Sequence, residues 1–369
     1  MKNCLRAFLV VLMILLALID VSIHALSASI DTVNNLSAEA SQSFKRPDDA
    51  IIKFPNPYFE EAVREIIDKP TGDIVASDVV GIVSLDLDSC GITDLTGIEY
   101  FRALERLECG TNGLTSLDVS KNTALKVLGC AQNPLKTLDV SQNPALEWLD
   151  CFENGLTTLD VSQNPALIGL GCSGNQLTTL DVSHNPALEE ISCFDNPLTM
   201  LDVSQNPALK WLSCANTQLI TLNVSHSPAL KELRCGSNQL TTLDVSQNAE
   251  LEWLSCDNNQ LMTLDVSQNP ALELLLCSEN QLATLEVGQN PVLKSLGCYT
   301  NKLTMLDVSH NPVLENLWCD NNQLTTLDVS QNPALEILSC ANNLFPDRSA
   351  IIGLSEEKLR KFTFDPQGL

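Results

Sequence analysis

Twelve of the fourteen cysteines recur at an unbroken interval of 21 residues, and they are the side chains of this chain best suited to do chemistry. The series consists of Cys109, Cys130, Cys151, Cys172, Cys193, Cys214, Cys235, Cys256, Cys277, Cys298, Cys319 and Cys340. Thiols pair as disulfides, bind metal ions and attack as nucleophiles. A fixed period places one cysteine in each copy of a repeated unit, so the chemistry open to them depends on how those units stack.

The repeated unit, typified by LEWLDCFENGLTTLDVSQNPA from residue 146, predicts a coil with two short strands. Alternation places Leu149 with Cys151, and Leu159 with Val161, on strand faces that point into the coil. The Asn-Pro pair at 164–165 predicts an extended or tightly turned return. Stacked coils would form a solenoid with two narrow parallel sheets. Since both flanks carry strands of similar width, we expect only slight curvature.

Five positions of this unit fit the leucine-rich repeat pattern LxxLxLxxNxL, with cysteine in the third leucine place: Leu146, Leu149, Cys151, Asn154 and Leu156. The 21-residue period resembles a bacterial subclass of these repeats, and the cysteine ladder with a helical cap is similar to the internalins. The resemblance covers residues 51–344. It implies an α/β solenoid, mostly β, wound as a right-handed superhelix with a small helical N-terminal cap. It also implies extracellular protein binding, often to a host surface.

The pattern changes along the chain and divides it into five segments. Lys2 and Arg6 precede an apolar run over 7–19, which predicts a signal peptide at 1–27, with a retained membrane anchor as the alternative. Residues 28–50 are polar and predict a flexible linker. Helical spacing over 51–81 predicts an N-terminal cap. One divergent and twelve cysteine-bearing coils occupy 82–344, and 345–369 form a C-terminal cap.

An asparagine stands three residues after eleven of the twelve repeating cysteines, from Asn112 to Asn343. In stacked coils these amides would form a ladder that binds backbone groups in the bend after each strand. Thr217 alone replaces the asparagine. We therefore predict that the coil beginning at Leu209 is the loosest of the stack.

Secretion makes disulfides the first use to consider for the cysteines. Cysteines of successive coils would have Cα atoms about 4.8 Å apart, but their parallel Cβ vectors leave the Cβ atoms farther apart than the roughly 3.8 Å of a disulfide. We therefore expect free, buried thiols, with disulfides as the alternative. A straight file of sulfurs does not surround a tetrahedral ion, so we expect no metal and no cofactor.

The second half of the unit carries an acidic file at the centre of its strand, interrupted by Asn223. Its members are Asp118, Asp139, Asp160, Asp181, Asp202, Asp244, Asp265, Glu286, Asp307 and Asp328. We expect mutual repulsion to make some of them resist ionisation or gather cations loosely, whereas a straight row makes a poor calcium cage. The net charge of −25 argues against nucleic acid and anionic membranes and favours a basic partner.

The first half of the unit varies from coil to coil at the strand positions that face outward, as a surface shaped to one partner requires. All four tryptophans lie on this sheet, three of them in one column. The predicted partner-binding residues are Trp148, Asp150, Phe152, Phe194, Trp211, Arg234, Trp253, Tyr299 and Trp318. Exposed aromatic rings are typical anchors of interfaces. The alternative is that each ring covers a glycine or serine of an adjacent coil, such as Gly169 or Gly171 beside Trp148.

No base, nucleophile and orienting group converge in this pattern, and His184, His226 and His310 stand alone in turns. We therefore expect no enzyme and no catalytic residues. The sequence predicts a secreted, extracellular or cell-surface protein-binding module for adhesion or host recognition. Its partner would be a protein such as a host or cell-surface receptor, and the chain would be a monomer not inserted in a membrane. The alternatives are a structural spacer of the cell envelope and a carbohydrate-binding module.

Overall fold

The computed structural model describes residues 50–367. The predicted signal peptide, and the predicted linker apart from Ala50, lie outside the described residues. Among the residues that are described, no helix is long and apolar enough to cross a membrane.

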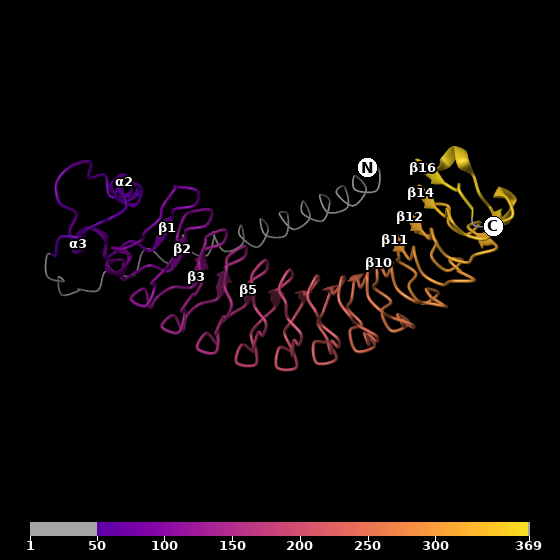
Figure 1. Ribbon diagram of the computed structural model, residues 1–369, viewed down its shortest axis with the longest axis horizontal. Helices are drawn as coiled ribbons and strands as arrows, with labels where there is room; N and C mark the ends of the chain where they lie inside the picture. The colour runs from indigo at the N-terminus through magenta and orange to yellow at the C-terminus, as the bar shows by residue number, and fades with distance from the viewer. Residues whose placement is uncertain (1–49, 368–369) are drawn as a thin grey trace. The chain divides into compact units, whose positions relative to one another are not determined.

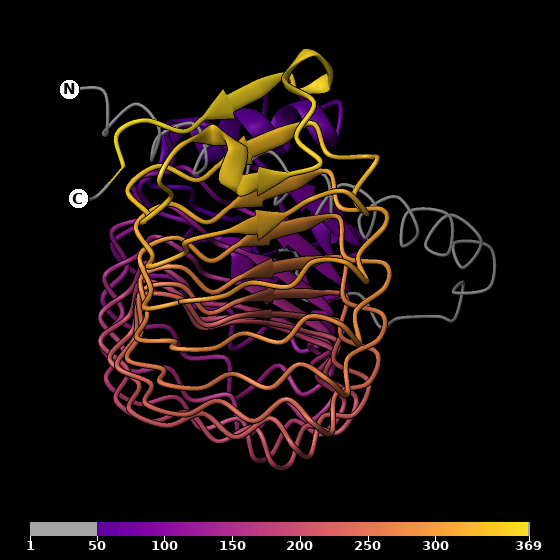
Figure 2. The same cartoon turned by 90° about the vertical axis from the view of Figure 1, so that its right-hand side faces the viewer.

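One parallel sheet of 14 strands runs through the whole stack, with one strand from each coil and the last strand from the C-terminal segment (Figures 1 and 2). Neighbouring strands of successive cysteine-bearing coils pair with a shift of one repeat, as in Trp148 opposite Gly169. The strands are β1 (Ser84–Asp86), β2 (Arg106–Glu108), β3 (Val127–Gly129), β4 (Trp148–Asp150), β5 (Gly169–Gly171), β6 (Glu190–Ser192), β7 (Trp211–Ser213), β8 (Glu232–Arg234), β9 (Trp253–Ser255), β10 (Leu274–Leu276), β11 (Ser295–Gly297), β12 (Asn316–Trp318), β14 (Ile337–Ser339) and β16 (Lys361–Thr363). The predicted mostly β solenoid is confirmed.

The second predicted row of strands is much less regular. It consists of isolated parallel bridges, such as Asp118 with Asp139, and a two-stranded sheet of β13 (Leu327–Asp328) and β15 (Ile351–Ile352). The coils curve with the large sheet on the concave side (Figure 1), so the expectation of slight curvature is wrong. Hydrogen bonds hold the strands of the large sheet about 4.8 Å apart, whereas the turns on the outer side are free to splay.

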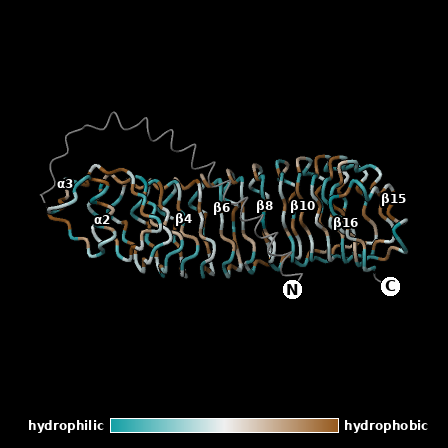
Figure 3. The backbone as a smooth tube through the Cα atoms, turned by 90° about the horizontal axis from the view of Figure 1, so that it is seen from above, coloured by the Kyte–Doolittle hydropathy of each residue, from teal (hydrophilic) through white to brown (hydrophobic). Residues whose placement is uncertain are grey.

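The core is a continuous file of inward side chains, as the alternation predicted. In a typical coil Leu149 is 1% exposed, and Cys151, Leu156 and Val161 are fully buried. All twelve ladder cysteines are fully buried in the same way. Figure 3 shows the matching alternation of apolar and polar residues along each coil.

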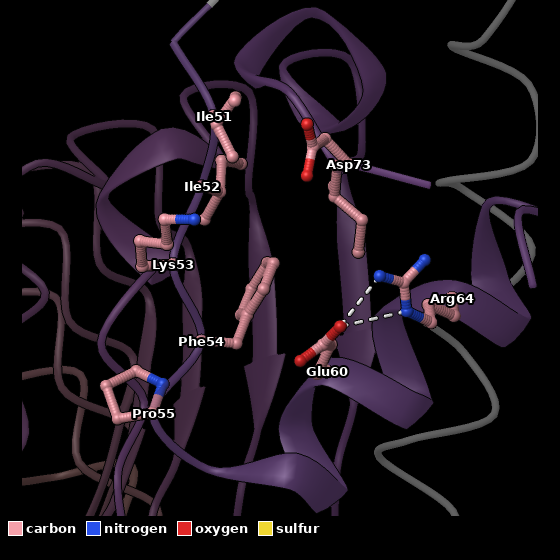
Figure 4. A pocket seen from close by; sticks show the side chains of 9 residues that line it. Ile51, Ile52, Lys53, Phe54, Pro55, Glu60, Arg64 and Asp73 are labelled. Atoms are coloured by element: carbon pink, nitrogen blue, oxygen red, sulfur yellow. Dashed lines mark hydrogen bonds and ion pairs between the residues drawn. The ribbon is translucent and has the colours of Figure 1, made fainter. Parts of the chain in front are cut away.

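A helical cap covers the first coil. Asn56 caps the start of helix α2 (Pro57–Ile66), because its side chain accepts hydrogen bonds from the N–H groups of Tyr58 and Phe59. It buries Phe59 and Val63 against the core, and α3 (Ala76–Val79) follows. Arg64 ties the cap together, because it forms an ion pair with Glu60 at 2.7 Å and donates to two carbonyls of the following loop (Figure 4). These contacts use the Arg64 guanidinium, which lies beside the shallow hollow shown in Figure 4.

The short helical turns are η1 (Ile98–Tyr100) in the first coil and η2 (Arg348–Ala350) and η3 (Glu356–Lys358) near the C-terminus. At this end Phe345 and Phe364 stack with ring centroids 6.0 Å apart and are buried. In this predicted C-terminal cap, Leu359 and Phe362 pack against the core while remaining partly exposed.

Asparagine side chains join each coil to the one before it. In the predicted ladder, Asn154 donates to the carbonyls of Cys130 and Cys151 at 3.1 and 3.0 Å and accepts from the Leu135 N–H at 3.2 Å. The prediction of this ladder is confirmed. A second ladder, which the sequence analysis missed, uses the asparagine before proline: Asn164 donates to the carbonyls of Val140 and Asn143, both at 2.9 Å.

Candidate partner-binding surface

The large sheet presents three columns of side chains on its concave face, which we call the inner wall. Two columns are the first and third residues of each strand, while the middle residue points into the core, as in Trp148, Leu149 and Asp150. The third column is the second residue after each strand. Because neighbouring strands lie about 4.8 Å apart, each column repeats at that spacing.

All nine predicted partner-binding residues lie on the inner wall. Trp148, Trp211 and Trp253 are first strand residues, and Asp150, Arg234 and Trp318 are third strand residues; Phe152, Phe194 and Tyr299 follow their strands. None is fully buried, and Trp253 is 37% exposed. The three tryptophans of the first column belong to β4, β7 and β9, so three and two strand spacings separate them, about 14 and 10 Å. The wall therefore offers separate anchors rather than one aromatic cluster.

Trp148 does cover a glycine of the next coil. A β-carbon at Gly169 would overlap the Trp148 ring, so the ring lies directly over that backbone. The residues opposite Trp211 and Trp253 in the next coil are Glu232 and Leu274. The covering role therefore applies to Trp148, whereas the other two rings lie beside larger side chains.

Other inner-wall side chains also lean toward the following coil, a feature that the sequence analysis did not foresee. The Glu108 carboxylate lies over Gly129, and Asp150 approaches the β-carbon position of Gly171 to 2.8 Å. Glu108 also forms an ion pair with Arg106 at 2.7 Å. Burial raises the pKa of Glu108 to about 7, against the opposing effect of Arg106.

Several carboxylates along the inner wall have raised pKa values. Burial raises the pKa of Asp257 to about 6 and also raises the pKa of Glu190. Desolvation by the surrounding wall raises the pKa of Asp150 as well, although its side chain remains open to solvent on one side. Arg234 is paired with Glu232 on its own strand. A cationic group that docked here would meet carboxylates that gain from a counter-charge.

The acidic file of the second half behaves differently from our expectation. In a typical coil the Asp160 carboxylate accepts the Ser162 N–H at 2.9 Å, and bonds from the Ser162 backbone and hydroxyl lower the pKa of Asp160. In the other coils, equivalent contacts from the serine two residues later lower the pKa of Asp118, Asp139, Asp181, Asp202, Asp244, Asp265, Asp307 and Asp328. The expected resistance to ionisation is therefore wrong for these carboxylates, because local hydrogen bonds outweigh the repulsion between neighbours.

The ladder cysteines are free thiols in the structure, and Cys90 is the exposed one among the described cysteines. Burial raises the pKa of Cys193 and of Cys298 to about 12, which keeps them as unreactive thiols. Within residues 50–367, no group of three or more His, Cys, Asp or Glu side chains is arranged to hold a metal ion.

Comparisons with known proteins agree with this architecture. No protein-family profile matches the sequence. Internalin J of Listeria monocytogenes serotype 4b (strain F2365) is 34% identical over 71 residues, which are 19% of this chain and only 8% of that protein. The functional domain of InlJ from Listeria monocytogenes, which includes a cysteine ladder, is 35% identical with a TM-score of 0.67 and covers 80% of this chain and 76% of that domain.

An internalin (InlF) from Listeria monocytogenes strain 4b F2365 has the same fold, with a TM-score of 0.76 at 20% identity. The match covers 86% of this chain and 96% of that structure. A parallel sheet with one strand per coil, inward leucines and asparagine ladders defines the class of leucine-rich repeat proteins. Within it, the chain belongs to the bacterial internalin-type proteins that carry a cysteine ladder.

Proposed function

We propose that this chain is a protein-binding module whose inner wall contacts the partner. Solenoids of stacked repeats present extended concave surfaces for binding. The observation that carries the proposal is that all four tryptophans, with Phe152, Phe194 and Tyr299, lie on this one face and none is fully buried. Aromatic side chains of this kind serve as interface anchors, each worth about 2 kcal/mol or more when a partner covers it.

The finer role that we propose is adhesion or recognition of a host or cell-surface protein by a secreted monomer. The predicted signal peptide at 1–27 supports export, and the acidic net charge supports a basic partner. We propose no catalytic role, because the inner wall combines anchors and carboxylates without an assembled nucleophile and base.

Capture experiments with the secreted chain test this proposal. Alanine replacement of Trp211 and Trp253 should abolish capture of a partner from host-cell or envelope extracts, with little change in melting temperature. The matched control replaces Met200 and Met305, which are 71% and 72% exposed in the second half of their coils. A partner lost equally in both variants, or retained in the tryptophan variant, would contradict the proposal.

Two other functions give different outcomes in the same experiments. A structural spacer predicts no captured protein that depends on the inner wall. A carbohydrate-binding module predicts binding on a glycan array that the tryptophan replacements remove, since aromatic faces also stack on sugars.

A further inference from the structure

The last strand of the large sheet, β16, begins an incomplete coil within the predicted C-terminal cap. Residues 359–369, LRKFTFDPQGL, fit the pattern LxxLxLxxNxL with phenylalanine in two leucine places and glutamine in the asparagine place. In the sheet Phe362 lies opposite Leu338 of the coil before, so Phe364 takes the place that Cys340 holds in that coil. The described part of the stack therefore ends on the first half of a further repeat.

This half-coil makes the same backward contacts as the coils before it. The Cys340 N–H donates to the Thr363 carbonyl at 2.8 Å, as equivalent bonds do at the earlier joints. Gln367 takes the part of a ladder asparagine, because its amide donates to the Cys340 carbonyl at 3.3 Å. It also accepts the Asn343 N–H at 3.0 Å. The strand β16 is thus built into the stack as a regular member of the sheet.

The forward edge of β16 carries unpaired backbone groups. Lys361 and Thr363 form their backbone bonds with the preceding coil. Because successive residues of a strand in a parallel sheet bond to opposite sides, the N–H and C=O of Phe362 face the other edge. Within residues 50–367, β16 pairs with β14 alone, and Figure 1 shows it at the end of the sheet. An edge of this kind is a template for one more strand.

Basic side chains mark this edge, in a chain whose net charge is −25. The residue just before a strand forms ion pairs across the joints, as Lys231 does with Glu252 of the following coil at 2.9 Å. Arg360 holds the same place before β16, is 76% exposed and pairs backward with Glu336 at 3.2 Å. Lys361 beside it is also exposed. A strand that arrived with an acidic residue in this place would meet Arg360 as Glu252 meets Lys231.

The apolar side chains of the half-coil lack the cover that the earlier coils have. Leu338 is fully buried, whereas Phe362 at the same place in the half-coil is partly exposed, as is Leu359. Arg348 lies over the rings of Phe362 and Phe364, at 5.5 and 5.7 Å from their centroids. Its own N–H groups bond to carboxylates, so it supplies no backbone partner for the strand. An apolar residue of an added strand would complete the cover of Phe362.

Protection of the edge is the other role that these charges could have. Lysine and arginine on an edge strand hinder pairing with other chains. This role explains the exposure of Arg360 and Lys361. It does not explain why the half-coil keeps the full set of repeat contacts behind it and leaves Phe362 partly exposed in front.

We propose that the free edge of β16 binds an extended segment of a protein partner as an additional parallel strand. The segment carries an acidic residue next to Arg360 and an apolar residue opposite Phe362, because the earlier joints of the stack hold strands of this pattern. Main-chain bonds to Phe362 supply affinity, and the alternate side chains supply specificity. This surface is separate from the inner wall, so the site goes beyond the proposed function and each of the two can fail without the other.

A peptide with the sequence of residues 251–261, LEWLSCDNNQL, tests the site on the full chain. The peptide carries a fluorescein label and alanine in place of Cys256, and fluorescence anisotropy measures its binding. Glu252 would lie next to Arg360, and Leu254 opposite Phe362. We expect the peptide to bind about fivefold or more tightly than its Ser255→Pro form, because proline removes the N–H that would bond to the Phe362 carbonyl.

Reversal of charge separates docking from a change in folding. The variant R360E/K361E should bind the peptide several-fold more weakly, and a Glu252→Lys peptide should regain binding to that variant. The matched control K121E/K302E makes the same change in net charge at exposed lysines of other coils.

Three results would overturn the site. They are equal binding of the peptide and its proline form, equal loss of binding in R360E/K361E and K121E/K302E, and no regain by the lysine peptide. The first of these would show that the charges of β16 only protect the edge. Alanine replacement of Trp211 and Trp253 should leave binding of the peptide unchanged, so the inner wall and the edge of β16 are tested separately.

Discussion

The joint before the coil that begins at Leu209 should be the weakest in the stack, and Thr217→Asn should strengthen it. In the preceding coil, Asn196 donates to the carbonyls of Cys172 and Cys193 at 3.0 and 3.1 Å and accepts the Leu177 N–H at 2.9 Å. The single proton of the Thr217 hydroxyl is instead shared between the Cys214 carbonyl, 3.0 Å away, and the side-chain oxygen of Asn238, the next asparagine of the ladder. A threonine has no amide to bridge back to the coil before it.

The structure sets the magnitude of this prediction. The amide introduced by Thr217→Asn would add a bond to the Cys193 carbonyl and an acceptor for the Leu198 N–H, and the bond from Thr217 to Asn238 would be lost. Two bonds gained against one lost, at about 1 kcal/mol net for each, give an expected gain of about 1 kcal/mol in the free energy of unfolding. The surface has an open hollow at this joint, lined by residues 195–197 and 216–218, which leaves room for the larger amide.

Urea unfolding measures the effect on global stability, and native-state hydrogen exchange in a separate experiment measures it at the joint. The Leu198 amide should exchange faster than those of Leu177 and Leu219, which donate to Asn196 and Asn238 at 2.9 and 3.0 Å. In the variant its exchange should slow about 5-fold, as about 1 kcal/mol implies. If Leu198 is already as protected as the other two amides, the reasoning about the joint is refuted.

The second ladder is also altered at this joint. Ser227 replaces its asparagine and donates to the Asn206 carbonyl at 3.2 Å. The neighbouring Asn206 reaches two carbonyls, those of Val182 and Asn185, at 3.0 and 2.9 Å. Ser227→Asn should therefore add about 1 kcal/mol, and a loss of stability in that variant would count against the ladder argument.

Three shorter predictions concern the wall and the thiols. The pKa of Glu108 is raised to about 7 from an ordinary 4.5, so between these pH values the folded state binds a proton that the unfolded state has lost. The free energy of unfolding should therefore fall by on the order of 1 kcal/mol as the pH rises through this range. Urea unfolding at several pH values should show that Glu108→Gln loses this pH dependence, and an unchanged dependence in the variant would contradict the prediction. Maleimide labelling of the native protein should modify Cys90 before any ladder cysteine. After unfolding without reductant, all ladder thiols should react. Disulfides that persist under these conditions would contradict the prediction of free thiols. Gly169→Ala should displace the Trp148 ring and so raise the quenching of Trp148 fluorescence by iodide. The measurement uses a chain in which the other tryptophans are replaced by phenylalanine. Unchanged quenching would mean that the ring does not rest on the glycine.

Periodicity was sufficient to predict the parts of this fold that repeat by residue type. Leu149, Cys151 and Val161 point inward because alternation along a strand admits no other assignment once one face is buried. Asn154 was predictable for the same reason. Asn164 recurs equally regularly and carries the second ladder. An asparagine before a proline indicates a turn, however, and this pattern does not reveal which groups the amide binds.

Features that depend on the distance between coils were not predictable. The residue two positions after each cysteine adopts a left-handed backbone, as in Glu153, Asn216 and Thr300 with φ of 49°, 50° and 55°. Six of these twelve residues are Asn, Asp or Gly, which favour this conformation, but the other six are not. The shared feature is a hydrogen bond to the next coil, such as that from the Glu153 N–H to the Ser173 carbonyl at 2.9 Å.

The arrangement of the ladders explains why the inner wall is free to vary. Each coil is held to the previous one by leucine and cysteine packing and by asparagine bonds to backbone carbonyls, which do not depend on the side chains of the wall. Gly169 occupies the wall position before Leu170, and Glu190 occupies the equivalent position in the next coil. The core residues next to these two positions remain fully or almost fully buried. Specificity can therefore change on the wall with little effect on the stack, which is why we place the partner contacts there and the stability of the molecule in the ladders.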